Sequence, residues 1–197
     1  MNEADRKRIL DSTAQVFLEK GFQRASTAEI ARRARTSKQT LYGLFPSKSD
    51  LFVAVIRSHT DELFSHHIEY LESNAPPQVV LADMGRRTLL LFSAPRFLAL
   101  YKILVAEAHN FPGLARELWQ CCVLRGHRLL AEYLRSQRIG GPSYQKAAAR
   151  FVSLILGNFL IDATLNPDLQ LSESMLRARV REAVRDFLSL YPARARK

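Results

Sequence analysis

The sequence predicts an all-α protein, on the strength of two patterns. Apolar residues recur with the 3.6-residue period of an amphipathic helix along most of the 197 residues. Clusters of proline, glycine and asparagine interrupt that period at 74–77, 93–95, 110–113, 140–142 and 166–167, where each would end a helix. No segment shows the alternation of a β-strand or the turn of a hairpin. We therefore expect about nine helices and no sheet.

The first helix is expected over residues 5–19, because Ile9, Leu10, Ala14 and Phe17 share one face. Gly21 follows at the position where a glycine ends many helices. Phe22 is then expected to turn back toward the core.

Residues 26–51 contain three helix starts in one short stretch, a spacing typical of a helix-turn-helix. Ser26, with Glu29 three residues later, has the pattern of a capping box, and Ser47 with Asp50 repeats it. Between them, Ser37 is the expected N-cap of a helix that ends near residue 44. The stretch predicts two short helices joined by a tight turn, followed by the start of a longer helix.

The middle helix of this stretch has no acidic residue in its first turn, so its N-terminus stays electropositive. Lys38, Gln39 and Thr40 occupy its first three positions, which in a recognition helix meet base edges in the major groove. Lysine suits guanine, glutamine suits adenine, and the threonine methyl group suits thymine. The positions at core spacing are taken by Leu41, Leu44 and Phe45. Lys48 stands at the next helix N-terminus, where free backbone donors favour a phosphate.

At these residues the chain resembles the tetracycline-repressor (TetR) family of bacterial regulators over about residues 6–56. The family pattern is similar to Ile30-Ala31, Ala34, Ser37-Lys38, Thr40-Leu41-Tyr42, Phe45 and Lys48. The resemblance implies double-stranded DNA as a partner, with bases contacted by Lys38, Gln39, Thr40 and Gly43 and phosphates by Thr27, Tyr42 and Lys48. Ser37 completes the set of expected DNA contacts.

One departure from the family pattern lies in the turn, where Gly-Val is common and this chain has Arg35-Thr36. A non-glycine residue in a left-handed turn costs about 1 kcal/mol. The turn is therefore expected either to be strained or to have a different shape.

The remaining chain is expected to form a long helix over 48–71, linking the DNA-binding part to the body, and further helices over 78–92, 96–109, 113–138, 143–165 and 172–190. We divide the chain into a helix-turn-helix domain, residues 1–47, and a helical ligand-binding and dimerisation bundle, residues 48–197. The TetR resemblance implies this order of helices.

The chain is strongly basic, with 29 lysines and arginines against 19 acidic residues, a formal charge of +10 and a pI near 10.1. This balance favours a polyanionic partner. A C-terminal basic cluster comprises Arg177, Arg179, Arg181, Arg185, Arg194, Arg196 and Lys197. We interpret this cluster as a solvated helix face and tail rather than a second DNA site.

Enzyme motifs are absent from the sequence: there is no nucleophile elbow, P-loop or dinucleotide-binding glycine pattern. The histidine spacings do not suit a shared metal, and the two adjacent cysteines, Cys121 and Cys122, point apart on a helix. We therefore expect no catalytic residues, no metal and no cofactor. The N-terminus lacks an apolar leader and no apolar run is long enough to span a bilayer, so a cytoplasmic protein without a membrane partner is expected.

Residues 78–138 are rich in large apolar side chains, including Phe92, Phe97, Leu100, Tyr101, Leu104, Phe111, Trp119 and Tyr133. Such residues either pack a core or line a pocket with a few polar anchors for a small molecule. The candidate ligand-binding residues are His66, Tyr101, His109, Trp119 and Asn158.

Residues 143–165 are apolar nearly all round, which favours burial against both the chain itself and a second copy. Together with the last helix they would form a four-helix interface in a homodimer. The candidate interface residues are Ser153, Gly157, Val180, Val184 and Phe187. Packing within one chain is an equally good account of the small residues.

Together with these patterns, the TetR resemblance implies a dimeric transcription regulator, a repressor that occupies a palindromic operator until a small-molecule effector releases it. A constitutive helix-turn-helix or nucleoid-associated protein without a ligand is the main alternative. A helical enzyme with a basic surface is less well supported, because no nucleophile and base lie within reach of each other.

Overall fold

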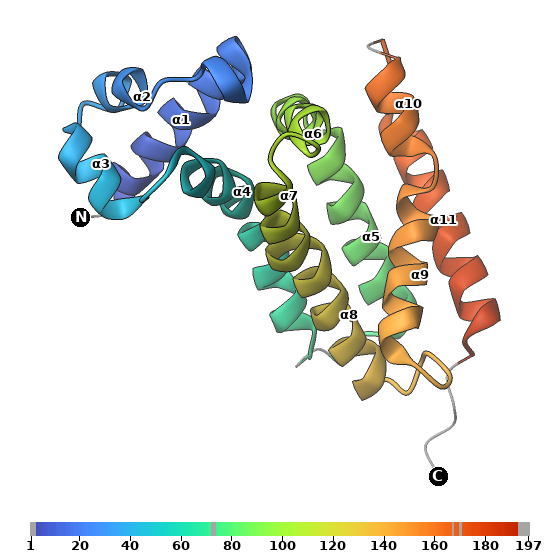
Figure 1. Ribbon diagram of the computed structural model, residues 1–197. Helices are drawn as coiled ribbons and strands as arrows, with labels where there is room; N and C mark the ends of the chain where they lie inside the picture. Colours follow the sequence, from blue (N-terminus) through green and yellow to red (C-terminus); the bar gives the residue numbers. More distant parts are fainter. Residues whose placement is uncertain (1–2, 72–73, 167, 170, 193–197) are drawn as a thin grey trace. The chain divides into compact units, whose positions relative to one another are not determined.

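The computed structural model describes residues 3–71, 74–166, 168–169 and 171–192 (Figure 1). Over these residues the regular elements are all helical and include no strand, which confirms the expected all-α class. Packing divides the chain into two compact units: a first unit, Met1–Thr60 with Arg96–Cys121, and a second unit, Asp61–Pro95 with Cys122–Lys197. Residues 96–121 thus pack with the N-terminal helices, although the sequence suggested that they belong to the body.

The first unit contains α1 (Glu3–Arg24), α2 (Thr27–Arg33), α3 (Lys38–Leu44), the first half of α4 (Lys48–Leu71), α6 (Pro95–Glu107) and α7 (Pro112–Leu118). Helix α1 is longer at both ends than the expected residues 5–19, and α2 and α3 are the two short helices expected within residues 26–51. Aromatic rings form much of the core. The Phe22 ring centroid lies 5.6 Å from that of Phe17, 5.5 Å from that of Phe52 and 4.8 Å from that of Phe111.

Gly21 explains how Phe22 reaches this core. It has φ 73° and ψ 174°, a conformation that side chains rarely adopt, and it kinks the chain near the end of α1. The chain turns there and Phe22 becomes buried, as the sequence predicted.

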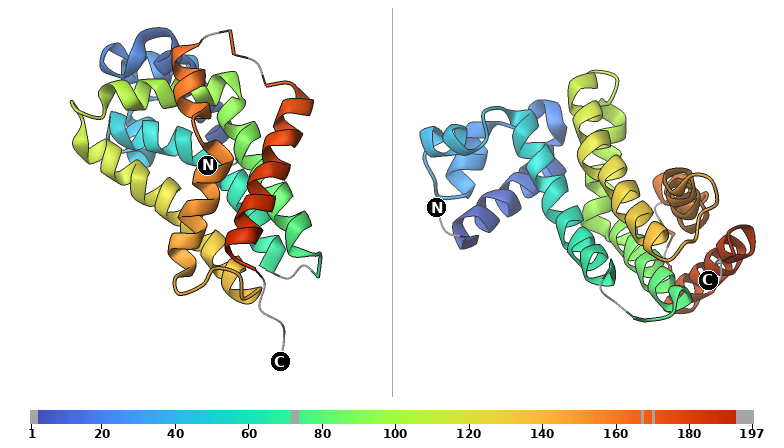
Figure 2. Two further views of the ribbon diagram at one scale, coloured as in Figure 1. Left: turned by 90° about the vertical axis from the view of Figure 1, so that its right-hand side faces the viewer. Right: turned by 90° about the horizontal axis from the view of Figure 1, so that it is seen from below.

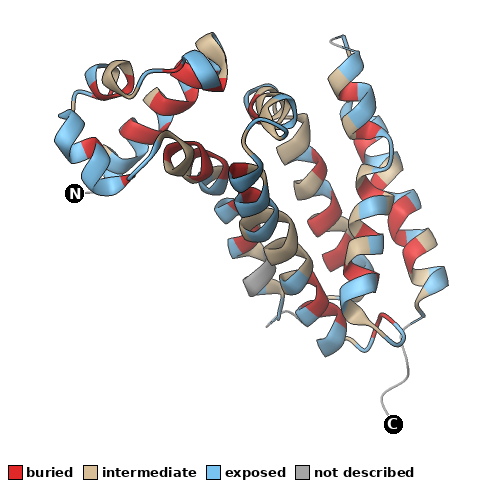
Figure 3. Cartoon of the chain, viewed as in Figure 1, coloured by how far each residue is buried: buried red, intermediate tan, exposed pale blue. Residues whose placement is uncertain are grey.

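The second unit contains the rest of α4, α5 (Pro77–Ser93), α8 (Arg125–Ser136), α9 (Tyr144–Leu156), α10 (Phe159–Leu165) and α11 (Glu173–Leu190). A π-helical stretch, Trp119–Leu124, leads from α7 into α8. Helix α9 packs against α5, α8 and α11, and α11 also packs against α5 (Figures 1 and 2). Buried residues follow the facing sides of these helices (Figure 3). The rings of Phe151 and Phe187 meet there, 5.1 Å apart.

Two segments expected to be single helices are divided. Residues 113–138 change to π-helical geometry at Trp119. Residues 143–165 break at Gly157, which has φ 44° and ψ −129°. The break is stabilised by Arg179, whose Nε donates to the Ile155 carbonyl at 2.6 Å. A Cβ on Gly157 would lie 2.4 Å from Arg179 Nη2, so both the backbone and this contact favour glycine.

Candidate DNA-binding surface

Ser37 is the N-cap of α3, as expected. The Ser37 Oγ accepts a hydrogen bond from the Thr40 backbone N–H at 2.9 Å, which satisfies one free donor of the first turn. The same Oγ lies 2.8 Å from the Thr40 hydroxyl. The first turn carries no acidic residue. The N-terminus of α3 is therefore well formed and remains attractive to an anion.

The turn between α2 and α3 has left-handed geometry at Arg35, with φ 51°. The Thr36 N–H donates to the Ala31 carbonyl at 3.0 Å, and the Arg35 N–H donates to the Arg32 carbonyl at 3.2 Å. These two bonds are the Schellman pattern that usually has glycine at the left-handed position. The turn therefore has the left-handed geometry that glycine usually adopts, and Arg35 adopts it with backbone strain.

The side chains expected to face bases and phosphates lie on the open side of α3. Ser37, Lys38, Gln39, Thr40, Tyr42 and Gly43 are all exposed. Leu41 and Phe45 are buried and anchor the helix on the core. Leu44, which was expected to point inward, is exposed. A Cβ on Gly43 would meet nothing within 4 Å, so a partner can approach the backbone closely there.

Two hydroxyl groups expected to contact phosphates lie together in this surface. The Thr27 hydroxyl, at the start of α2, lies 2.9 Å from the Tyr42 hydroxyl of α3. Each hydroxyl can both donate and accept, so the pair retains a donor for a phosphate oxygen. The contact also ties the first turn of α2 to the recognition helix.

Lys48 is already engaged within the first unit. Its Nζ donates to the Gln23 carbonyl at 2.8 Å and lies 3.4 Å from the Ala25 carbonyl. It also lies 4.9 Å from the centroid of the Phe22 ring. An ammonium has three N–H donors, so one donor remains for a phosphate.

Charged side chains fix α2 on α1. The Arg33 guanidinium bonds both carboxylate oxygens of Glu19, at 2.7 and 2.6 Å, and reaches Glu29 at 2.7 Å. Lys20 also pairs with Glu29. Hydrogen bonding to Arg33 lowers the pKa of Glu19, and hydrogen bonding first to Lys20 and then to Arg33 lowers the pKa of Glu29.

This ion cluster corrects one expectation. Ser26 is the N-cap of α2, but its side chain makes no capping bond. The Ser26–Glu29 capping box does not form, since the Glu29 carboxylate pairs with Lys20 and Arg33 instead. The second expected box is confirmed in one of its two bonds: the Ser47 Oγ accepts from the Asp50 N–H at 3.1 Å. The Asp50 carboxylate accepts from the Ser47 hydroxyl, at 2.7 Å, where a full box would have it accept from the Ser47 backbone N–H.

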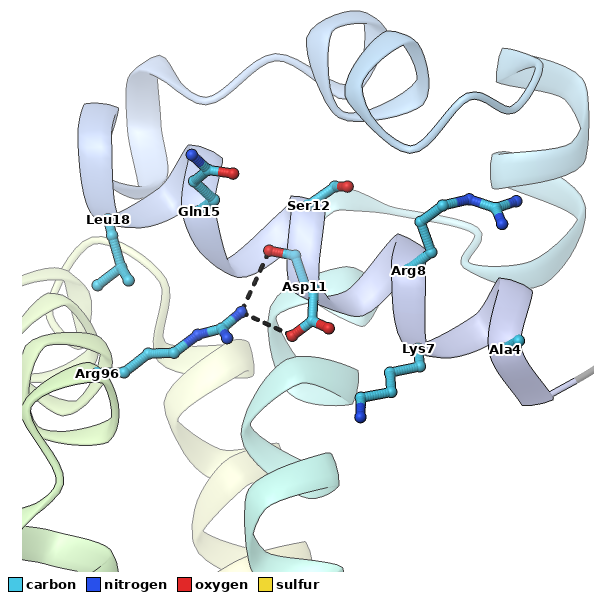
Figure 4. Close-up of a pocket in the computed structure, with 8 residues that line it drawn as sticks. All are labelled: Ala4, Lys7, Arg8, Asp11, Ser12, Gln15, Leu18 and Arg96. Carbon is cyan, nitrogen blue, oxygen red and sulfur yellow. Dashed lines mark hydrogen bonds and ion pairs between the residues drawn. The ribbon is translucent and has the colours of Figure 1, made fainter.

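An open groove of about 570 Å³ runs along another face of α1 (Figure 4). It is lined by Ala4, Lys7, Arg8, Asp11, Ser12, Gln15, Leu18 and Arg96. The Arg96 Nη2, from the first turn of α6, lies 2.9 Å from the Asp11 carboxylate and 3.2 Å from its carbonyl. These bonds hold α6 against α1, and the groove contains none of the predicted DNA contacts.

The predicted ligand-binding residues are divided between the units. Tyr101, His109 and Trp119 belong to the first unit, and His66 and Asn158 belong to the second. His109, Trp119 and Asn158 are exposed. His66 is half-buried, with Nδ1 3.1 Å from a Glu69 carboxylate oxygen. The three exposed side chains do not suit the walls of an enclosed pocket, and the set as a whole stays a prediction.

The predicted dimer residues are also divided. Ser153 and Gly157 are exposed. Val180, Val184 and Phe187 are buried in the core of their own unit. This placement corrects the expectation that these three side chains face a second copy, because a partner could not touch them without opening the chain.

The C-terminal basic cluster matches its interpretation as a solvated face where it is described. Arg177 pairs with Glu173 at 3.0 Å, and Arg185 pairs with Asp186 at 2.9 Å, on the surface of α11. Arg179 instead bonds carbonyls at the end of α9. Arg194, Arg196 and Lys197 lie outside the described residues.

Tyr133 carries a buried polar group that the sequence pattern did not single out. Tyr133 was counted among the apolar aromatic residues, yet its hydroxyl is buried and has no hydrogen-bond partner in the described part of the chain. The signal available in the sequence was a tyrosine among the apolar positions of α8, where phenylalanine would pack equally well.

The described residues include no single helix that is both long and apolar enough to cross a membrane, and two bent helix pairs, α5 with α6 and α9 with α10, meet the same criteria only as pairs.

Two family models together match most of this chain. A family model described as bacterial regulatory proteins, tetR family, matches residues 9–55. A second model, described as AefR-like transcriptional repressor, C-terminal domain, matches residues 79–193. The HTH-type transcriptional regulator YvkB of Bacillus subtilis is 37% identical over 164 residues, covering 78% of this chain and 80% of YvkB.

Two further similarities bear on function. The nucleoid occlusion factor SlmA of Aliivibrio fischeri is 26% identical over 176 residues, covering 89% of this chain and 77% of SlmA. Among solved structures, the flavonoid-responsive regulator FrrA has a TM-score of 0.74 and 27% identity, covering 98% of this chain and all of FrrA (100%).

Proposed function

The chain belongs to the TetR family of bacterial regulatory proteins and is a DNA-binding transcription regulator, and we propose that it is a dimeric repressor released from a palindromic operator by a small molecule. The observation that carries the DNA-binding part of this proposal is the open face of α3. Its N-terminal half carries exposed polar side chains, while Leu41 and Phe45 are buried and pack the helix against the core.

On this proposal, α3 enters the major groove with its first turn leading. Lys38 and Gln39 reach base edges, and the Thr40 methyl group contacts a thymine, because the Thr40 hydroxyl lies against Ser37. Thr27, Tyr42 and Lys48 contact phosphates on either side and fix the register without reading sequence.

We propose that the dimer surface lies on the exposed side of α9 and α10. Ile161 and Leu165 are 60% and 77% exposed, which is unusual for large apolar side chains in neighbouring turns of one helix. Ser153 and Gly157 are exposed on the preceding helix, where small side chains would allow a second copy to approach closely. A two-fold dimer would place one α3 in each half-site of a palindrome.

We propose a small, largely apolar effector, with flavonoids as the first class to test. The similarity to a flavonoid-responsive regulator over nearly the whole chain supports this choice. The effector would bind the free protein better than the DNA-bound protein, since only a difference in affinity can shift the balance between the two states.

The experiment is to select bound fragments from genomic DNA and to titrate the protein on them at fixed salt, with and without a flavonoid panel. We expect a few palindromic sites bound tightly without ligand and more weakly with ligand. Similar affinity for operator and random DNA would contradict the proposal.

The similarity to a nucleoid occlusion factor supports a second candidate, a DNA-binding protein without an effector. In that case the selected fragments would lie at many sites distributed around the chromosome, and no compound would change their affinity.

A further inference from the structure

Tyr133 is the least satisfied polar side chain in the described structure. It lies on α8 in the second unit and is fully buried. Its hydroxyl has no hydrogen-bond partner among the described residues. Burial raises the pKa of Tyr133 to about 12, so the group is a neutral O–H donor at any physiological pH. A buried donor without an acceptor has lost its bonds to water without replacement.

Among the described residues of the second unit, none accepts a hydrogen bond from this hydroxyl. The buried polar residues in the described chain are Thr13 and Thr60, and both belong to the first unit. On α9, which packs against α8, the buried residues are all apolar: Ala147, Ala148, Phe151 and Ile155. Since no described residue accepts this bond, a molecule from outside the chain can supply the acceptor.

A buried water is a poor candidate for that acceptor. Buried waters typically make about three hydrogen bonds, and this site offers one side-chain donor. A larger molecule can bury apolar surface of its own, which favours binding, while one of its polar atoms pairs with the hydroxyl. A charged ligand is disfavoured, because no charged side chain is buried in the described part of the second unit to compensate it.

The packing of α8 shows where such a molecule could enter. None of the residues of the preceding π-helical stretch, Trp119–Leu124, is buried. The buried residues of α8 begin only at Leu130. Turns of π-helix are frequent at functional sites. The described contacts of the first turn of α8 are with α4, where Arg125 pairs with Asp61 and lies 4.9 Å from the centroid of the Phe64 ring. On the proposal below, these surface contacts would part to admit a ligand beside Tyr133.

We propose that the Tyr133 hydroxyl is the hydrogen-bond donor of an effector site inside the second unit, and that its ligand is a neutral, largely apolar molecule with a carbonyl oxygen. This inference rests on the proposed effector response. It adds the anchoring atom and the chemical class of the ligand.

The test combines Tyr133→Phe with two matched probes. Flavanone carries one ketone, and flavan has the same rings with a methylene in its place. The full-length protein is titrated with each compound and binding is followed by thermal stability and calorimetry. Tyr144→Phe is the control, because Tyr144 is a half-buried tyrosine at the start of α9 in the same unit.

Without ligand, we expect Tyr133→Phe to melt at the same temperature as the wild type or about 2 to 4 °C higher, because the unpaired hydroxyl is gone. Wild type and Tyr144→Phe should bind flavanone about 3- to 10-fold more tightly than flavan. In Tyr133→Phe this preference should disappear.

Three outcomes would overturn the inference. A clearly lower melting temperature for unliganded Tyr133→Phe would show that the hydroxyl already has a partner. An equal preference for flavanone in wild type and Tyr133→Phe would remove Tyr133 from the site and leave the effector response intact. Failure of both probes to bind the wild type would overturn the proposed flavonoid class of effector together with its anchor.

Discussion

Helices α3 and α11 were each predicted from the sequence to present a face to an external partner, and the structure treats the two faces differently. On α3 the predicted DNA contacts, from Lys38 to Gly43, are exposed. On α11 the predicted dimer contacts Val180, Val184 and Phe187 are buried by their own chain. Polar residues beside an N-cap can be assigned outward because apolar residues occupy the inward positions. Apolar residues can only be assigned to burial, because the pattern does not reveal which chain buries them.

The largest effect expected from this comparison is that of Phe187→Asp. The Phe187 ring packs 5.1 Å from the rings of Phe151 and Tyr191 and is fully buried. Its loss should cost about 3 to 5 kcal/mol, as for other buried phenylalanines, and the buried charge adds to that cost. Circular dichroism should show unfolding of the second unit. The control is Leu190→Asp, since Leu190 is exposed on the same helix.

A folded Phe187→Asp monomer in sedimentation would contradict this account. It would mean that Phe187 faces a second copy and that α11 behaves as the sequence alone suggested.

A smaller effect is expected from substitutions in two turns that have the same geometry. Arg35 ends α2 and Arg138 ends α8, with φ 51° and 56°, and each has the same pair of Schellman bonds. Arg35→Gly and Arg138→Gly should each stabilise the protein by roughly 0.5 to 1 kcal/mol in urea unfolding. Only Arg35→Gly should also weaken DNA binding, because it removes a charge beside α3. Equal DNA affinity for both variants would place Arg35 away from DNA.

Lys48 should show the smallest effect. Lys48→Met keeps an apolar stem beside Phe22 and removes the ammonium. If the ammonium contacts a phosphate, affinity should fall equally for all DNA sequences, and the slope of log affinity against log salt should fall by about one. An unchanged slope with lower thermal stability would show that Lys48 serves only the carbonyls of Gln23 and Ala25.

The features that the sequence predicted correctly depend on neighbours close in the chain. The capping bonds of Ser37 and Ser47 each join residues three positions apart. The turn at Gly21 needs only the freedom of one residue. Local patterns were therefore sufficient for the order of the helices and for the exposed face of α3.

The features that the sequence did not predict depend on residues far apart in the chain. The break at Gly157 is stabilised by Arg179, which lies 24 positions from the Ile155 carbonyl that it bonds. Lys20 pairs with Glu29, which was expected to take part in the capping box of α2. Helix α6 packs with α1 through Arg96 and Asp11, which are 85 positions apart. None of these partners can be identified by periodicity.

The central claim, that α3 reads base pairs, is tested most directly by measuring wild type and Gln39→Ala on an operator library at fixed salt. Gln39 is exposed at the second position of α3, and glutamine forms a two-bond pair with adenine. Gln39→Ala should cost about 1 to 3 kcal/mol on the preferred operator and relax the preference at one base pair in each half-site. An equal loss on operator and random DNA, or no loss at all, would contradict the claim.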